Sequence, residues 1–264
     1  MFATHLRAGR RITGMLLHFA VVWATAVLIA TRTSRAQRQS IARELAAQTL
    51  RILGVRVRVR GAIPHATPVL VVANHVSWLD VYALNCLLRA CFVAKREVRA
   101  WPFVGTMVAA FGALFIRRGS PRDAARVRDQ ITDALHRGDR VAVFPEGTTT
   151  DGTSLRRFYP ALFQSAIDSG GMVQPIAIRY VDDHGQPTAA AAFIDDMTFM
   201  ASLRRIAAAP RITVELHFGP PRSAVDRTRR ELAADCHSWI AERLGVPVAP
   251  AAHQAPWRRL DRAA

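Results

Sequence analysis

The sequence predicts an α/β protein with a mostly parallel central sheet flanked by helices and preceded by an N-terminal membrane-associated helical hairpin. Three observations support this fold class. Short apolar runs alternate along the chain with segments of helical periodicity, as they do in α/β folds. Most of these runs are apolar throughout, which is typical of strands buried on both faces. The length of 264 residues fits one domain of about 200 residues plus an appendage.

The first segment, residues 1–54, is expected to form a helical hairpin that anchors the chain to a membrane. Residues 14–31 carry no formal charge, and as a helix they would be about 27 Å long, close to the thickness of the bilayer hydrocarbon. Residues 34–53 keep helical spacing, with arginines around the apolar positions. Because arginines flank the apolar stretch on both sides, we expect the hairpin to rest in one leaflet. A cleaved signal peptide and an apolar helix folded against the domain are the alternatives.

The domain that follows, expected over residues 55–246, begins with a strand. Gly54 is expected to end the hairpin, and VRVRVRG then alternates strictly, which predicts a half-buried strand with three arginines toward solvent. Further strands are expected over residues 69–73, 91–94, 113–116, 141–144, 172–178 and 212–218. Helices are expected over residues 79–89, 121–137, 158–169, 199–208 and 224–244. Residues 247–264 are expected to form a flexible basic tail.

Charge and cysteine content narrow the classes of partner. Lys and Arg number 36 against 20 Asp and Glu, which gives a formal net charge of +16 and favours anionic partners such as lipid headgroups, phosphorylated small molecules or nucleic acid. Lys95 is the only lysine in the chain, which makes it a candidate for a role that arginine does not fill. The three cysteines are scattered without metal-ligand spacing, so we expect no metal site and a reducing compartment.

The stretch NHVSWLD, residues 74–80, places polar groups directly after an apolar strand. In open α/β sheets ligands bind at the carboxyl ends of strands, so this position favours a site. His75 and Asp80 would meet only if His75 lies in the turn before the next helix, where Asp80 could hold its tautomer for proton transfer. The alternative is a solvated turn in which Ser77 and Asp80 cap that helix. The sequence has no GxSxG, phosphate-binding loop or HExxH motif.

Two further strand ends carry polar clusters. GALFIRR places Arg117 and Arg118 after one apolar run, and VFPEGTTTDG places Glu146, Gly147 and three threonines after another. Turn chemistry alone accounts for the glycine and threonines. It does not account for charged groups at several strand ends, which in a parallel sheet face one rim.

Four sequence blocks together resemble one known family. NHVSWLD, GALFIRR, FPEGT and VQPI match, in order, the four motif blocks of the glycerolipid acyltransferases that include 1-acylglycerol-3-phosphate acyltransferase. The resemblance covers about residues 55–220. It implies that His75 is a general base and Asp80 its orienting partner. It further implies a substrate-binding set, namely Lys95, Arg117, Arg118, Glu146, Gly147, Thr148, Thr149 and Arg157, and a site-shaping set, namely Asn74, Pro145 and Pro175.

One position departs from the family pattern. The family's third block usually reads EGTRS, whereas here Thr149 stands where an arginine is expected. Arg156 and Arg157 follow in LRRFYP and could compensate for the lost cation. The acceptor implied by the resemblance is therefore either 1-acyl-sn-glycerol-3-phosphate, which we favour at this stage, or a lyso-ornithine lipid or other lysolipid.

The resemblance implies an O-acyltransferase that uses acyl-CoA or acyl carrier protein as donor substrate and needs no cofactor. We expect membrane lipids and a lysophospholipid acceptor as partners, no nucleic acid, and a location on the cytoplasmic face of the inner membrane through a monotopic or single-span anchor. An alternative from another class is a catalytically inactive basic module that binds acidic membranes or nucleic acid.

Overall fold

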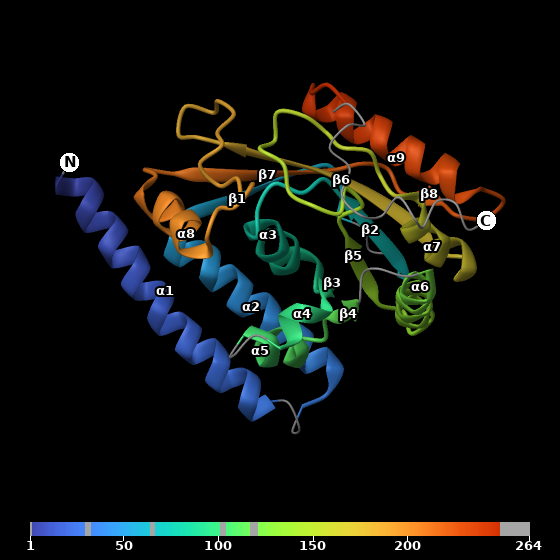
Figure 1. The fold of residues 1–264 in the computed structure, drawn as a ribbon, viewed down its shortest axis with the longest axis horizontal. Helices are drawn as coiled ribbons and strands as arrows, with labels where there is room; N and C mark the ends of the chain where they lie inside the picture. The colour runs from blue at the N-terminus through green and yellow to red at the C-terminus, as the bar shows by residue number, and fades with distance from the viewer. Residues whose placement is uncertain (1, 30–32, 64–66, 101–103, 117–120, 249–264) are drawn as a thin grey trace.

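The computed structural model describes residues 2–29, 33–63, 67–100, 104–116 and 121–248. Within these residues, eight strands form one sheet in the order β1-β7-β6-β2-β5-β3-β4, with β8 paired to β6 (Figure 1). Only the pairings of β6 with β7 and with β8 are antiparallel. The predicted fold class, a mostly parallel sheet flanked by helices, is confirmed. The strands are β1 (Val55–Arg60), β2 (Val69–Ala73), β3 (Cys91–Lys95), β4 (Leu114–Ile116), β5 (Arg140–Val143), β6 (Met172–Val181), β7 (Ile212–Phe218) and β8 (Arg222–Ser223).

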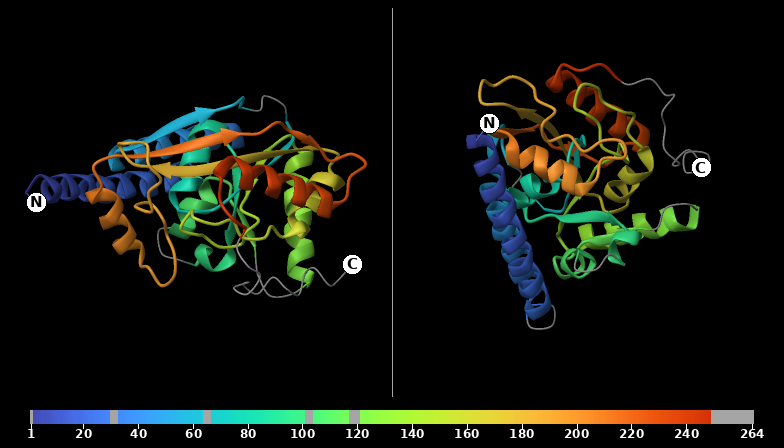
Figure 2. Two further views of the ribbon diagram at one scale, coloured as in Figure 1. Left: turned by 90° about the horizontal axis from the view of Figure 1, so that it is seen from above. Right: turned by 60° about the vertical axis from the view of Figure 1, so that its left-hand side comes forward.

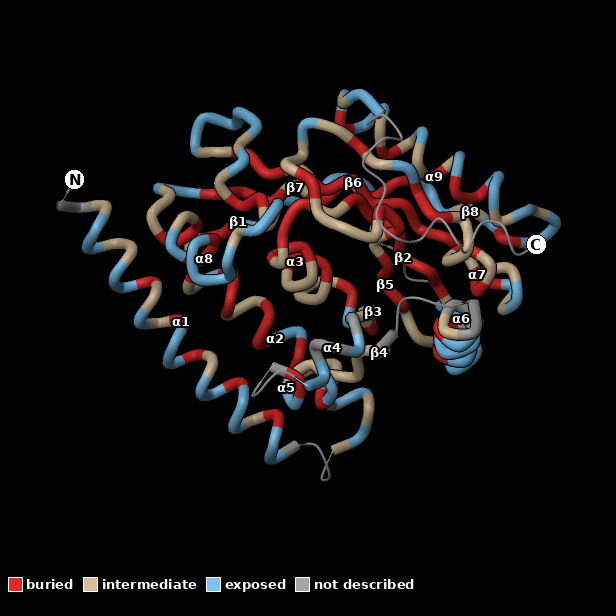
Figure 3. Tube along the Cα trace, viewed as in Figure 1, coloured by how far each residue is buried: buried red, intermediate tan, exposed pale blue. Residues whose placement is uncertain are grey.

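Helices cover both faces of the sheet and enclose two apolar cores. Strand β2 is buried throughout, and its residues alternate between the cores, because successive side chains of a strand point to opposite faces. One core lies against α2 (Arg35–Leu53), α3 (Leu79–Leu88) and α8 (Phe199–Ala208). The other lies against α6 (Pro121–His136), α7 (Gln164–Asp168) and α9 (Arg229–Leu244). The central strands are therefore the most deeply buried part of the fold (Figure 3).

The N-terminal hairpin consists of α1 (Phe2–Ile29) and α2. Helix α1 begins twelve residues before the apolar stretch that predicted it, and it packs against α2, α5 (Val104–Ala110) and α8. In both views of Figure 2 it runs along the side of the molecule away from α9. Helix α2 starts with a capping box at Ser34 and ends at Gly54, whose φ of 72° suits glycine.

Several predicted boundaries differ from the structure. The helix expected over residues 158–169 is present in shorter form, as a 3₁₀ turn, η1 (Pro160–Phe163), that continues directly into α7. The helix expected from residue 224 begins later, at Arg229, where Thr228 and Glu231 form a capping box. Helices α4 (Arg96–Arg99) and α5 were not predicted. Residues 249–264 of the expected tail lie outside the described residues, and the domain boundaries stay a prediction.

Candidate active site

Two neighbouring strands bring the first and third sequence blocks together. β2 and β5 are parallel and paired in register, with Val72 opposite Val143, so the loops that follow them leave the same edge of the sheet. The main-chain N–H of Thr150 donates a hydrogen bond to the carbonyl oxygen of His75 at 2.8 Å. The two loops therefore form one connected unit above the carboxyl ends of the strands.

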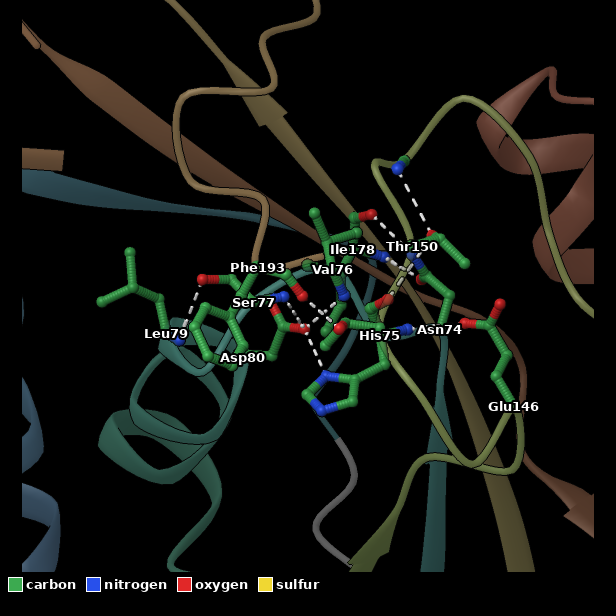
Figure 4. Close-up of polar contacts among 12 residues, drawn as sticks. Asn74, His75, Val76, Ser77, Leu79, Asp80, Glu146, Thr150, Ile178 and Phe193 are labelled. Carbon is green, nitrogen blue, oxygen red and sulfur yellow. Dashed lines mark hydrogen bonds and ion pairs between the residues drawn. The ribbon is translucent and has the colours of Figure 1, made fainter. Parts of the chain in front are cut away.

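His75 and Asp80 form a hydrogen-bonded pair. The imidazole Nδ1 lies 2.8 Å from Asp80 Oδ2 (Figure 4). The contact is possible because α3 begins at Leu79, which leaves His75 in the loop before the helix. A carboxylate can only accept, so Nδ1 carries the proton and Nε2 is left as the acceptor. This is the arrangement of an imidazole base held in one tautomer by an acidic partner.

Asp80 is fully buried, and its carboxylate is surrounded by donors. Oδ2 also accepts the main-chain N–H groups of Val76 at 2.7 Å and Ser77 at 2.9 Å. Oδ1 accepts the phenolic hydroxyl of Tyr180 at 2.6 Å. Such donors stabilise the ionised form of a buried carboxylate, which would otherwise be costly. The alternative of helix capping by Ser77 and Asp80 is met only in part: Asp80 accepts the Ser77 N–H, but α3 has Trp78 as its N-cap and no side-chain cap bond.

The ring of His75 is fixed by stacking as well as by its partner. It lies against Phe144 with the ring centroids 4.0 Å apart and the planes 9° from parallel. The side chain keeps 20% of its surface exposed, whereas Asp80 has none. An exposed Nε2 edge on an otherwise immobilised ring is what proton transfer from a bound hydroxyl requires.

Asn74 joins the end of β2 to β6. Its side-chain amide donates to the carbonyl oxygen of Ile178 at 2.9 Å, and its carbonyl accepts the Ile178 N–H at 2.7 Å. The side chain is buried, so these two bonds satisfy polar groups that have little access to water. Asn74 therefore fixes the position at which the His75 loop leaves the sheet.

Glu146 holds the two active-site loops by their main chains. Oε1 accepts the N–H of His75 at 2.7 Å, and Oε2 accepts the N–H of Arg156 at 2.8 Å. The family resemblance implied that the Glu146 side chain lies beside the acyl acceptor. The buried geometry instead describes a clamp between the His75 loop and the segment that carries Arg157. Whether Glu146 also contacts substrate stays a prediction.

Burial raises the pKa of Glu146 to about 8, and the N–H groups of Arg156 and His75 oppose that rise. The folded state then binds a proton more tightly than the unfolded chain, in which the pKa is near 4.5. The resulting stabilisation is fully present below the unfolded value and is lost as the pH rises through about 8.

Glu146→Gln is therefore expected to remove a pH dependence of folding. Between pH 5.5 and 8 the stability of the unmodified protein should fall relative to the variant by up to about 1.4 kcal/mol per pH unit, because the amide does not titrate. Urea unfolding of both proteins at several pH values measures this difference. Glu242→Gln, on the exposed side of α9, is the matched control. A stability difference between the unmodified protein and Glu146→Gln that stays constant with pH would contradict the assignment.

The other residues of the third sequence block shape the loop after β5. Gly147 has a φ of 72° in a turn closed by its own N–H on the Phe144 carbonyl at 3.1 Å, and it is followed by the partly buried Thr148. Pro145 is buried, and its carbonyl accepts the Tyr159 N–H at 3.0 Å. The geometry therefore supports a site-shaping role for Pro145.

Thr149 is linked to a segment that the sequence did not indicate. Its hydroxyl donates to the main-chain carbonyl of Phe193. The Phe193 N–H in turn donates to the carbonyl of Val76 at 2.9 Å. Phe193 thus lies between the first and third blocks, and the hydroxyl at 149 is engaged with protein rather than free for a ligand.

The remaining predicted residues are less closely connected to His75. Arg117 and Arg118 lie outside the described residues, and so does the side chain of Lys95, which ends β3 beside β4. Arg157 is exposed. Pro175 lies within β6 next to Val72, packed near Gly219 on the face covered by α9. Their roles stay predictions. The described residues contain no cluster of three His, Cys, Asp or Glu placed to hold a metal ion.

Three site residues were missed by sequence reasoning, namely Phe144, Tyr180 and Phe193. Tyr180 had a usable signal, because a tyrosine inside a buried strand normally requires a hydrogen-bond partner. Its partner could not be read from the sequence, since Asp80 is a hundred residues away and belongs to another element. Phe144 and Phe193 looked like ordinary apolar residues.

Comparisons with known proteins show which protein family the chain belongs to. Residues 54–179 match the family model described as Acyltransferase. The chain is 40% identical over 213 residues to a lyso-ornithine lipid O-acyltransferase of Pseudomonas aeruginosa. The matched region covers 81% of each chain. It is 39% identical over 176 residues to a 1-acyl-sn-glycerol-3-phosphate acyltransferase of Neisseria meningitidis serogroup B, covering 66% of this chain and 69% of the relative.

A solved structure shares the fold. The 1-acyl-sn-glycerophosphate acyltransferase PlsC from Thermotoga maritima superposes with a TM-score of 0.65 at 22% identity, covering 89% of this chain and 96% of that one. The fold is that of an α/β acyltransferase. The chain belongs to the acyltransferase family, as the sequence blocks predicted.

Proposed function

We propose that this chain is a membrane-bound O-acyltransferase that transfers a fatty acyl group from a thioester, acyl-CoA or acyl carrier protein, to the hydroxyl of a lysolipid. The observation that carries the proposal is the His75–Asp80 pair at 2.8 Å, with Nδ1 engaged and Nε2 left to accept a proton. Nε2 takes the hydroxyl proton while the oxygen attacks the thioester carbonyl. The carbon–sulfur bond then breaks, and the proton passes to the leaving thiolate.

The chemistry of this step matches the groups present. A positioned base typically accelerates such a reaction about 10²- to 10⁴-fold, and holding donor and acceptor together contributes the proximity term. Asp80 stabilises the imidazolium that forms as the proton is transferred. All four of its hydrogen-bond donors are protein groups, so the carboxylate is held in place without access to solvent.

The leading acceptor is 1-acyl-sn-glycerol-3-phosphate, which would give phosphatidic acid in phospholipid biosynthesis. Arg157 supports a phosphate, because it is exposed on the segment that Glu146 ties to the His75 loop. A second candidate is a lyso-ornithine lipid, which has no phosphate. One observation favours it: the position where the family carries arginine holds Thr149, and its hydroxyl is engaged with Phe193.

A competition experiment separates the two acceptors. Both lysolipids are presented together in vesicles at equal amounts with one labelled acyl thioester, and the products are resolved by chromatography. We expect phosphatidic acid to predominate. Predominant acylation of the ornithine lipid would overturn this acceptor and leave the base and the reaction type unchanged. Running the reaction with acyl-CoA and then with acyl carrier protein identifies the donor.

We further propose that α1 lies along the membrane surface on the cytoplasmic side of the inner membrane. Residues Thr4–Leu28 are long and apolar enough to cross a bilayer, by length and composition. One face of α1, however, is buried against the domain along the helix. The guanidinium of Arg11 donates to the carbonyls of Ala207, Ala209 and Pro210 at the end of α8. These contacts favour a helix that stays with the domain.

The opposite face of α1, here called the outer face, is apolar and exposed (Figure 3). It consists of Leu6, Leu16, Leu17, Val21, Trp23, Val27 and Leu28. At 100° per residue these positions lie opposite the buried Arg11, Met15 and His18. An apolar face of this size suits insertion into one leaflet.

Changing the outer face is expected to weaken membrane binding. Leu17→Asp with Leu28→Asp should lower partitioning onto anionic vesicles by about tenfold or more, because each leucine loses roughly 1.5–3 kcal/mol of apolar burial. Sedimentation with vesicles of phosphatidylglycerol measures the change. Val225→Asp is the matched control, since Val225 is equally exposed but lies near α9. Unchanged partitioning of the double variant would contradict the proposed orientation.

A further inference from the structure

We propose that Tyr180 is a positioning residue for acyl transfer, acting through Asp80 on His75. The inference rests on the proposed function, because it assigns Tyr180 a part in the same proton transfer. Tyr180 belongs to none of the four sequence blocks, and it lies on β6 on the far side of Asp80 from the imidazole.

The hydrogen bonds of Asp80 are unequally divided between its two oxygens. Oδ2 accepts three N–H groups, from the His75 ring and from the main chain of Val76 and Ser77. Oδ1 accepts the Tyr180 hydroxyl at 2.6 Å. Asp80 is fully buried, so bulk water cannot replace that donor. The Tyr180 hydroxyl is therefore what holds the second oxygen of the carboxylate.

β6 places Tyr180 firmly enough for this task. Tyr180 is paired with Val214 of β7, and beyond the end of β2 the Asn74 side chain bonds both main-chain groups of Ile178, two residues before Tyr180. Side chains at this spacing point to the same face of a strand. Asn74 therefore positions both the His75 loop and the strand that carries Tyr180. This places His75 and Tyr180 at fixed positions on either side of Asp80.

The charged and titratable groups around Asp80 determine the sign of the effect. They are His75 in the loop before α3, Tyr180 on β6, and Glu146 after β5 with Arg156 beside it. Burial, and then the neighbouring Asp80, raises the pKa of Tyr180 well above its ordinary value, so the phenol remains a donor throughout the assay range. Without this donor the buried carboxylate is less stable as a free anion. The His75–Asp80 pair then retains its proton to higher pH.

Tyr180→Phe tests this role, because it removes the hydroxyl and keeps the ring. We expect kcat to fall about tenfold, the rate equivalent of about 1.4 kcal/mol, with little change in KM for either substrate. The acidic limb of the pH–rate profile should move to higher pH by about half a unit to one unit. Tyr82→Phe is the matched control, since Tyr82 lies on α3 with its partly buried ring against Trp78 and not at the carboxylate.

A purely structural tyrosine would give a different result. It would lower the melting temperature or the yield of folded protein and leave the pH–rate profile of the folded fraction unchanged. A Tyr180→Phe protein whose kcat and acidic limb match those of Tyr82→Phe overturns the proposal.

A second measurement does not depend on acyl transfer. In protein labelled with ¹⁵N-histidine, the His75 resonances are assigned by their loss in His75→Ala and followed from pH 5 to pH 9. We expect the midpoint of the His75 titration to be higher in Tyr180→Phe than in the unmodified chain and in Tyr82→Phe. An unchanged midpoint overturns the positioning role, even in a chain whose catalysis is established. If the midpoint rises but the unmodified chain shows no acyl transfer, the coupling of Tyr180 to His75 through Asp80 stands and the proposed function is rejected.

Discussion

His75→Ala is expected to lower kcat for acyl transfer by about 10²- to 10⁴-fold, which is the usual contribution of a positioned general base. The hydroxyl of a lysolipid is a weak nucleophile until its proton is removed, and Nε2 of His75 is the acceptor that the hydrogen bond at Nδ1 leaves available. Alanine also removes the ring stacked on Phe144 and leaves the rest of the Asp80 cluster in place. Turnover is measured with labelled acyl thioester at saturating lysolipid.

Two further results should accompany that loss of rate. Vesicle binding should be unchanged, because His75 lies in the loop after β2 and is not part of the outer face of α1, and the melting temperature should stay close to that of the unmodified protein. His184→Ala is the matched control, since His184 is a highly exposed histidine in the loop after β6. Full activity in purified, folded His75→Ala protein would eliminate the proposed base.

Asp80→Asn is expected to be almost as damaging, with a loss of about 10³-fold or more in kcat. The amide has nearly the same shape, but it carries no charge to stabilise an imidazolium. The amide oxygen is expected to stay on the main-chain N–H groups of Val76 and Ser77, so the NH₂ group faces Tyr180. Because Tyr180 can turn its hydroxyl to accept, the fold has a way to tolerate the amide. The effect should therefore appear in kcat rather than in stability.

The test of Asp80→Asn compares its kinetics and its unfolding with those of Asp183→Asn. Asp183 is exposed in the loop after β6 and makes its ion pair with His184, so its variant reports the effect of losing one surface carboxylate. If Asp80→Asn retains a kcat within a few-fold of this control, Asp80 does not orient the base. Loss of folded protein alone would point to a structural carboxylate.

The sequence was sufficient for the central sheet because its signals are local. Continuous apolar runs such as residues 69–73 are buried on both faces, and the alternating arginines of β1 face solvent, as predicted. The helix expected over residues 158–169 was less accurate, because local spacing does not distinguish an α-helical turn from a 3₁₀ turn. Apolar residues at suitable spacing suggested one helix, whereas the chain there divides into a 3₁₀ turn and a short helix held by tertiary packing.

The His75–Asp80 contact could be anticipated, because the five-residue spacing allows it only when His75 precedes the helix, and α3 does begin at Leu79. The hydrogen bonds by which Glu146 joins the two loops could not be anticipated. They depend on which main-chain groups two loops far apart in sequence present to a buried carboxyl group. Tyr180 and Phe193 reach the site from elements far away in sequence. Such contacts are set by the packing of whole elements, which periodicity and motifs do not encode.

Whether the chain moves acyl groups at all is best decided by one measurement on the purified protein in anionic vesicles. A labelled acyl thioester and a lysolipid are supplied together, and ester formation and thiol release are followed in the same sample. We predict equal amounts of acylated lipid and free thiol, both lost in His75→Ala while the protein remains bound to the vesicles. Vesicle binding without ester formation in the unmodified chain would contradict the enzyme and identify an inactive basic membrane-binding module instead.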